Sequence, residues 1–247
     1  MSGSRPQEKV MMFPDDSLQS IIQPSDWWIK NESKKLCRGA LVFVFAPHVD
    51  QIPYTFEPVG RSVPTEHTSA TIMVSPLKIG QPLNKTNLPV AAMTTFEGEV
   101  WAAYRAKTRP SLVFSSESIP VHKALTRGKP NHATAPTFLA APYYGIDQNG
   151  KRAGYNPEFV ERVRHCEYPQ FHWDKLPMSS TKESLLRLDH LQPFGVHHDS
   201  YAVSDYMLSA DAMDILDDLL RWLIWGGVSA ESMILAYREL IESNFDS

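Results

Sequence analysis

The sequence carries a short basic run between two apolar segments. Arg105, Lys107 and Arg109 alternate along this run, with strand-forming residues before it at 100–104 and after it at 112–114. An arginine at the rim of such a strand pair can hold a phosphate through two parallel N–H bonds, and it stays charged at physiological pH. A basic turn that only faces water is the alternative, and the spacing alone leaves both interpretations open.

The distribution of charge favours an anion site in the middle of the chain, whose net charge is −4 over 247 residues. Residues 99–164 hold ten basic and five acidic side chains, a balance of +5. Residues 174–247 hold five basic and thirteen acidic ones, a balance of −8. The middle therefore attracts an anion, whereas the acidic end excludes a nucleic-acid surface there. A balance of +5 is small for a dedicated duplex binder.

Histidines are the next candidates for chemistry. His190 follows a strand-like segment, and a histidine at a strand rim can act as an acid–base group, with a structural role as the alternative. The adjacent residues His197, His198 and Asp199 lack a second matching cluster, which favours a solvated turn over a metal site. No glycine-rich phosphate loop, CxxC pair or GxSxG motif is present, so kinases, zinc modules and common hydrolases are unsupported. We expect neither a metal nor a cofactor.

Strands must position these residues, and apolar runs between turn signals predict them. The predicted strands are 41–45, 70–74, 88–93, 100–104, 112–114, 137–141, 170–173 and 185–188. Ser209 is predicted to cap a C-terminal helix that ends at Gly226, and a second helix follows Ser229. Pro157 begins one or two further helical turns. Short strands followed by packed helices are typical of a mainly β, α+β fold built on a small barrel.

Composition indicates the cellular compartment in which the protein is expected. The two cysteines, Cys37 and Cys166, fit a reducing compartment and no disulfide framework. No apolar run approaches the ~20 residues of a membrane span, which predicts no membrane partner. Residues 1–16 lack the apolar core of a secretory signal and are interpreted as a loose tail. We therefore expect a cytoplasmic protein.

Several segments follow one another along the chain in an order that is also found in a known protein family. They are Gly98–Trp101, Thr108–Ser115, Leu139–Pro142, Tyr168–His172, Glu183–Pro193 and the helix from Ser209. Each is weak alone, but their order over residues 96–226 resembles that of the MazF/PemK family of toxin endoribonucleases. The resemblance implies an SH3-like small β-barrel over residues 96–247, with the C-terminal helices attached.

The resemblance also implies an activity, metal-independent cleavage of single-stranded RNA by attack of a ribose 2′-OH on its own phosphate. It makes Arg109 the cation that stabilises the phosphorane, and it places Tyr143 and His190 in the catalytic set. Tyr143 stands where the family usually has Thr or Ser, and its ring could also stack on a base. Arg105 and Lys107 are expected to hold neighbouring phosphates.

Further RNA contacts are expected at three positions on the aligned strand ends, namely Ser115, Tyr144 and Gln192. The partners that the resemblance implies are single-stranded RNA and an antitoxin protein. The alternative is a catalytically inactive RNA- or protein-binding barrel within a toxin–antitoxin or defence assembly.

The N-terminal half, residues 17–95, is expected to form a β region of its own. The segments Arg38–Val44 and Ala70–Pro76 resemble an opening and a third strand, which leaves open a degenerate duplicate of the barrel. A duplicate would give a barrel pair within one chain, and a homodimer is the other way to form a pair. Unrelated strands that extend the barrel are the alternative.

Overall fold

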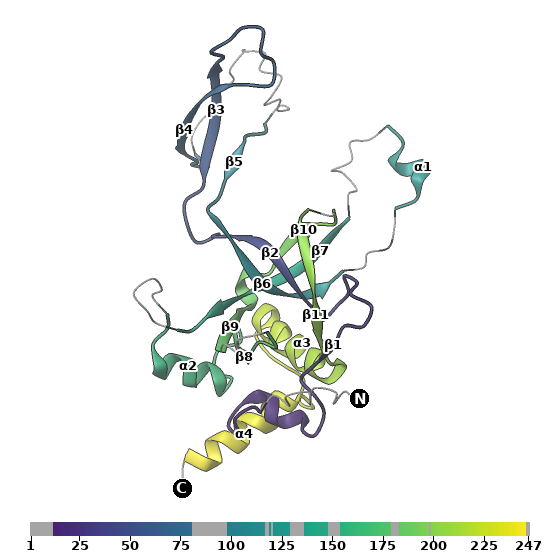
Figure 1. Cartoon of the computed structure of the whole chain (residues 1–247). Coiled ribbons are helices and arrows are strands. Elements are labelled where there is room, and N and C mark those ends of the chain that lie inside the picture. The colour runs from purple at the N-terminus through teal and green to yellow at the C-terminus, as the bar shows by residue number, and fades with distance from the viewer. Residues whose placement is uncertain are drawn as a thin grey trace, which may run out of the picture. The chain divides into compact units, whose positions relative to one another are not determined.

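The chain divides into two compact units, Met1–Val44 with Arg109–Ser247, and Phe45–Thr108 (Figure 1). The computed structural model describes residues 12–80, 98–116, 119, 121–128, 136–147, 154–178, 183–197 and 199–245. The expected strand at 88–93 and most of the expected N-terminal tail lie outside the described residues. The division differs from the expected boundary at residue 95, because the second unit is inserted between two strands of the main one.

The main unit is built on a curled antiparallel sheet, so the expectation of a mainly β fold with C-terminal helices is confirmed. Its strands are β1 (Trp28–Lys30), β2 (Ala40–Pro47), β6 (Ala106–Ser115), β7 (Thr137–Gly145), β8 (Phe171–Lys175), β9 (Glu183–Arg187), β10 (Gln192–Gly195) and β11 (Tyr201–Leu208). Their order is β1-β11-β2-β6-β7-β9-β8, and β10 pairs with β7.

Strand β2 lies in the middle of this sheet, between β11 and β6. Its run Leu41–Val44 is apolar without alternation, which suits a strand covered on both faces. Gly39, at φ +84°, precedes it, and a Cβ there would lie 3.3 Å from Cγ of Met213. Glycine at this position therefore lets the helix that contains Met213 approach the sheet closely.

The described residues also form helices. They are η1 (Leu18–Ile22), α1 (Lys123–Thr126), α2 (Pro157–Arg164), η4 (Leu188–His190), α3 (Ala210–Trp225) and α4 (Met233–Phe245). As expected, the Ser209 side chain caps α3 by accepting from the backbone N–H of Ala212, and Gly226 ends the helix in the left-handed conformation. None of the described helices has the length and apolar character needed to cross a membrane.

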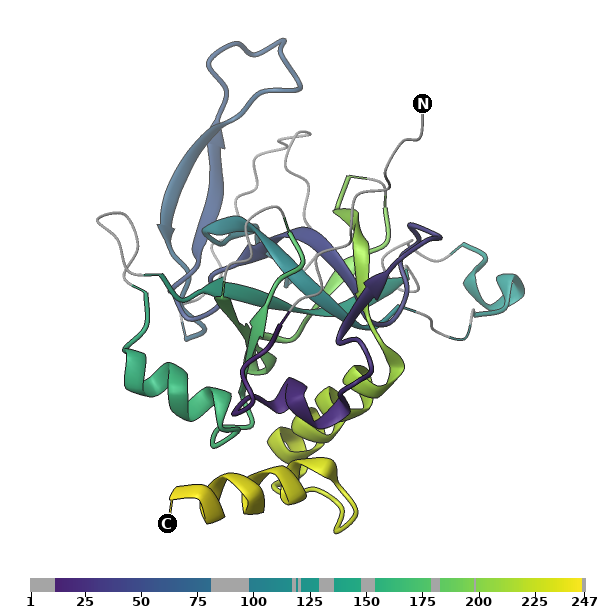
Figure 2. The ribbon, with the colours of Figure 1, turned by 60° about the horizontal axis from the view of Figure 1, so that its bottom comes forward.

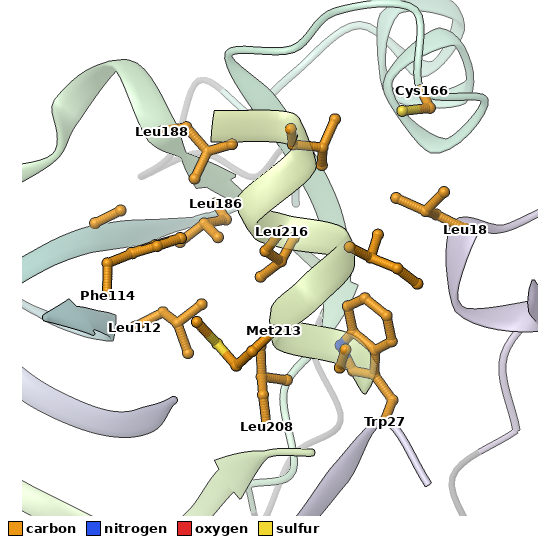
Figure 3. Close-up of a cluster of buried hydrophobic side chains, with 14 of the residues drawn as sticks. Leu18, Trp27, Leu112, Phe114, Cys166, Leu186, Leu188, Leu208, Met213 and Leu216 are labelled. Carbon is orange, nitrogen blue, oxygen red and sulfur yellow. The ribbon is translucent and has the colours of Figure 1, made fainter. Parts of the chain in front are cut away.

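The main core lies between one face of the sheet and α3, with η1 beside α3 and α4 beyond it (Figure 2). Figure 3 shows Met213 and Leu216 of α3 among side chains from the strands, including Leu112 and Leu208. Burying a leucine such as Leu216 stabilises the fold by roughly 1.5–3 kcal/mol. The position of α3 is thus fixed by its apolar stripe.

A second, smaller core covers the opposite face of the sheet. Leu185 and Leu186 are neighbours in β9, so they point to opposite faces. Leu186 belongs to the main core, whereas Leu185 packs with Trp173 and with Val160 and Val163 of α2. This division decides which side chains of β7 and β9 can face a ligand.

The second unit contains a three-stranded antiparallel sheet of order β4-β3-β5. Its strands are β3 (Tyr54–Gly60), β4 (Thr71–Pro76) and β5 (Ala102–Ala103). The expected strand at 100–104 therefore shortens to β5, which pairs with β3 and not with the Arg109 strand.

Strand β2 takes the place beside β6 that the sequence analysis gave to Gly98–Trp101. The place needs a strand that is apolar on both faces, and Leu41–Val44 supplies one whereas Trp101 and Tyr104 are exposed. Because β2 and β6 belong to one sheet, Arg38–Val44 opens the same sheet as the Arg109 strand. Within the described residues it is not the start of a separate barrel.

Candidate functional site

Five polar side chains of the main unit meet where β6, β7 and β9 run side by side. Arg109 comes from β6, Tyr144 from β7 and Arg187 from the end of β9, while Asp189 and His190 lie in η4 directly after it. The contacts that join them are described below, and these five residues are termed the Arg109 cluster. Three neighbouring strands and a short helix thus hold the cluster on a rigid scaffold.

Strand register places Arg109 on Tyr144. Ser111 of β6 is opposite Pro142 of β7, and the same register continued by two residues sets Arg109 opposite Tyr144. Cζ of Arg109 lies 3.9 Å from the centroid of the Tyr144 ring. This contact stabilises the pair by about 0.5–2 kcal/mol and occupies the face of the guanidinium, whose N–H groups lie in its plane.

Arg109 keeps its charge and donors for a ligand. None of the salt bridges found in the described part of the chain includes Arg109. Its Nε is buried and has no hydrogen-bond partner among the described residues. A buried donor without a partner costs roughly 1–3 kcal/mol, which an anion bound at this site would offset.

A chain of hydrogen bonds runs through the rest of the cluster. Arg187 donates from Nε and Nη2 to the two carboxylate oxygens of Asp189, at 2.7 and 2.6 Å. This bidentate bond raises the pKa of Arg187, so its charge is permanent. Nη2 of Arg187 also lies 2.8 Å from Nε2 of His190, and Nδ1 of His190 lies 2.9 Å from the Tyr144 hydroxyl.

The net charge of the Arg109 cluster suits a single anion. Arg109 and Arg187 supply two positive charges and Asp189 one negative charge, which leaves an excess of one positive charge. Cζ of Arg187 lies 5.8 Å from the same Tyr144 ring centroid that Arg109 covers. The net charge of the cluster therefore suits one phosphodiester.

Tyr143, which the sequence analysis assigned to catalysis, lies elsewhere. Its side chain is 1% exposed, and its hydroxyl donates to Asp174 at 3.0 Å in the main core. Burial raises the pKa of Tyr143 well above its usual value. Because successive side chains of a strand alternate in direction, Tyr144 faces the cluster and Tyr143 cannot stack on a base.

The other expected site residues are only partly brought together. The Gln192 side chain donates to the His190 backbone oxygen at 3.4 Å, so Gln192 adjoins the cluster. Ser115 lies six residues from Arg109 along β6, a span of roughly 20 Å in a strand. Arg105 and Lys107 belong to the second unit, and their contacts with phosphates stay predictions.

Sequence reasoning missed Arg187 and Asp189. The available signal was an Arg–Asp pair two residues apart, which can form a bidentate bond. Strand periodicity could not place it, because Asp189 lies in η4 after the strand has ended. No group of three metal-ligating side chains occurs among the described residues. His198 lies outside them.

A buried carboxylate beneath the cluster's sheet has a structural role. Asp174 accepts from the indole N–H groups of Trp27 and Trp28, at 3.3 and 3.2 Å, and from Tyr143. Burial raises the pKa of Asp174 to about 7, although these donors oppose the shift. Burial also lowers the pKa of His172, two residues away in β8, to about 3. The carboxylate thus ties the N-terminal segment to β8.

No protein-family model, curated protein or solved structure matches this chain. The functional interpretation therefore depends on the geometry of the Arg109 cluster and on the resemblance in segment order.

Proposed function

We propose that the protein is a toxin-type, metal-independent endoribonuclease that acts on single-stranded RNA, with Arg109 binding the scissile phosphate. The observation that carries the proposal is a guanidinium that is held by its face on Tyr144 and has no carboxylate partner among the described residues. The RNA backbone supplies a phosphodiester at every nucleotide, and arginine matches its geometry.

The proposed reaction is an internal transesterification. The ribose 2′-oxygen loses its proton and bonds to the adjacent phosphorus, and the bond from phosphorus to the 5′-oxygen breaks. The 5′-oxygen takes a proton, which leaves a 2′,3′-cyclic phosphate and a 5′-hydroxyl. Negative charge develops on the phosphorane, and Arg109 stabilises it. Removal of one electrostatic contact of this kind typically costs 10²–10³ in rate.

Single-stranded substrate is favoured by the composition of the site. An aromatic ring and cations are the usual means of binding unpaired nucleotides. The modest positive balance of residues 99–164 fits contact with a short stretch of backbone better than with a duplex. We propose an antitoxin protein as the natural partner, on the family resemblance.

A second candidate function, RNA binding without cleavage, is favoured by one specific observation. Both ring nitrogens of His190 are engaged by protein side chains, Nε2 by Arg187 and Nδ1 by Tyr144. A histidine that takes or gives a proton directly to substrate needs one nitrogen within reach of it. If binding alone is the function, the cluster serves as a phosphate clamp.

End-labelled RNA distinguishes the two candidates. The purified full-length chain is incubated with a single-stranded RNA, the matching duplex and the matching DNA, each with an excess of EDTA. The endoribonuclease proposal expects cleavage of the single-stranded RNA alone, with 2′,3′-cyclic phosphate ends. Salt-dependent binding of the RNA without product would support the clamp. Cleavage that EDTA abolishes would contradict the metal-independent mechanism.

A further inference from the structure

The three-stranded sheet of the second unit has one face on which every side chain is uncharged and mainly apolar. Residues that lie opposite each other in an antiparallel pair point to the same face of a sheet. Phe56 of β3 lies opposite Val74 of β4, and on its other side its backbone N–H donates to the Trp101 backbone oxygen at 3.2 Å. Because side chains alternate along each strand, one face, termed the apolar face, consists of Tyr54, Phe56, Pro58, Ile72, Val74, Pro76, Trp101 and Ala103.

The opposite face of the same sheet is more polar. On it, Thr55 and Glu57 of β3 lie opposite Ser75 and Met73 of β4. Three of these four side chains are polar, and Glu57 is an acid. A sheet with one apolar and one polar face is normally covered on its apolar side.

The apolar face is nevertheless exposed. Tyr54, Ile72, Val74 and Trp101 are all exposed, and neither of the two cores described above includes any residue of this face. The face extends over about 20 Å along β4 and about 14 Å across three strands, which gives roughly 300 Å². Contiguous apolar patches of this size on soluble proteins are often binding surfaces.

Strand β4 borders the apolar face and also offers an edge for pairing. It is the outer strand of the order β4-β3-β5, and among the described residues it pairs with β3 alone (Figure 1). The run Thr71–Ser75 contains no charge and no proline, which are the residues that usually protect an edge. An edge strand presents unpaired N–H and C=O groups, so β4 can accept a further strand. At the other edge, β5 has only two residues.

The size of the apolar face favours a single segment of a partner over a second copy of this chain. A stable homodimer buries about 800 Å² on each copy, more than twice the roughly 300 Å² that this face provides. One added strand, in contrast, forms a main-chain ladder along β4 and packs its side chains beside Ile72 and Val74. The edge and the face together therefore suit an extended segment.

We propose that the second unit binds an extended segment of a partner protein, which joins its sheet as a strand beside β4. The segment has apolar side chains at every second position, next to Ile72 and Val74, because a charge there would be buried without a partner. Polar side chains lie between them, on the more polar face of the sheet. This binding does not depend on RNA binding at the Arg109 cluster, since every residue that it uses belongs to the second unit.

Peptide selection on the full-length chain tests strand addition. The probe is a phage-displayed library of random octapeptides, and selected sequences are synthesised with a fluorescent label for anisotropy. We expect apolar residues at alternate positions. Methylation of alternate backbone nitrogens along one edge of the peptide should abolish binding, and methylation along the other edge should not, because only one edge faces β4. Failure to select a peptide, or selected peptides that bind equally well with either edge methylated, would overturn the proposal.

Val74→Asp and Met73→Asp form a matched pair of variants. The two residues are neighbours in β4 and similarly exposed, at 52% and 48%, but only Val74 belongs to the apolar face. Val74→Asp should weaken peptide binding roughly tenfold or more, since the bound segment would bury the new charge. Met73→Asp should leave the affinity unchanged. Equal affinities of the two variants for the peptide would overturn the proposal.

Two further measurements keep this comparison decisive. Val74→Thr keeps the shape of the side chain, so it should unfold at the same temperature as the unaltered chain and still bind the peptide about threefold more weakly. An unchanged affinity of this variant would contradict the proposal. Sedimentation velocity of the unaltered chain should show a monomer. A dimer that Val74→Asp dissociates would instead place a second copy on the apolar face and overturn the proposed occupant.

Discussion

Two neighbouring tyrosines of β7 show how far one residue changes the environment of a side chain. Tyr143 donates to the buried Asp174, whereas Tyr144 lies between two guanidinium groups on the opposite face. The sequence places both at a strand end, but it does not show which of the two side chains points to the core. That choice is made by the partner strand, where Leu186 is opposite Tyr143.

Tyr143→Phe is expected to lower stability and leave RNA binding unchanged. The substitution removes one donor from a buried carboxylate, which typically costs about 1–3 kcal/mol. Urea unfolding monitored by tryptophan fluorescence measures the loss, and fluorescence anisotropy with a labelled 2′-O-methyl RNA octanucleotide measures binding. A stable variant with weakened RNA affinity would return Tyr143 to the site and contradict its placement in the core.

The buried pair Asp174 and His172 predicts a characteristic pH dependence of stability. The pKa of Asp174 is raised from 3.8 to about 7 on folding, so the folded state holds a proton that the unfolded state has lost. This makes the unfolding free energy fall as the pH rises through that interval. The pKa of His172 is lowered from 6.5 to about 3, which makes stability rise with pH below 6.5. Between pH 4 and 6.5 the two slopes oppose each other.

In Asp174→Asn, the pH dependence of the unfolding free energy that is due to His172 should no longer be offset. Relative to the unaltered chain, the unfolding free energy of the variant should rise by about 1.4 kcal/mol per pH unit between pH 4 and 6. Urea midpoints at several pH values provide the measurement. Parallel curves for the two proteins would show that Asp174 does not change its protonation on folding.

At the scale of elements, helix α3 is the one most fully specified by local sequence. Its cap at Ser209 and its end at Gly226 were both expected and are confirmed. The runs around Leu41 and Leu112 likewise predicted strands that the structure contains. Strands β1, β3, β10 and β11 were missed. Of these, β1, β10 and β11 alternate weakly and are held by pairing with distant strands.

Two substitutions on α3 test how the helix is held. Leu216 is 0% exposed, whereas Ile224, two turns later, is 55% exposed. Leu216→Ala should cost about 2–5 kcal/mol through loss of burial and the cavity it leaves. Ile224→Ala should cost less than about 1 kcal/mol. Thermal and urea unfolding of both variants measure this difference, and similar losses would contradict the packing of α3 on the sheet.

At the scale of the whole chain, the order of strands is what the sequence did not reveal. Residues 98–101 were expected beside the Arg109 strand because the two are close in sequence. The structure instead places β2 there, and the residues between β2 and β6 form a unit of their own. Long-range pairing depends on which strand is apolar on both faces, and local patterns cannot specify the partner.

Truncation tests this organisation. A fragment that begins at residue 96 lacks β1 and β2, so it loses the strand between β11 and β6 and should be insoluble or unfolded. Replacement of residues 49–104 by a short glycine-containing turn should preserve folding of the main unit. The backbone bond between His48 and Arg105, at 2.7 Å, shows that a short link can span the gap. Circular dichroism and unfolding curves of both proteins provide the comparison, and a stable fragment from residue 96 would contradict the role of β2.

The central claim is that Arg109 binds and stabilises the scissile phosphate, and one kinetic comparison tests it most directly. The cleavage rate of a single-stranded RNA is measured for the unaltered chain, for Arg109→Ala and for Arg221→Ala, an exposed arginine of α3 whose partner is Asp218. We expect Arg109→Ala to lose about 10²–10³ in rate with its melting temperature little changed, and Arg221→Ala to behave as the unaltered chain. A folded Arg109→Ala protein that cleaves RNA at the unaltered rate would contradict the account.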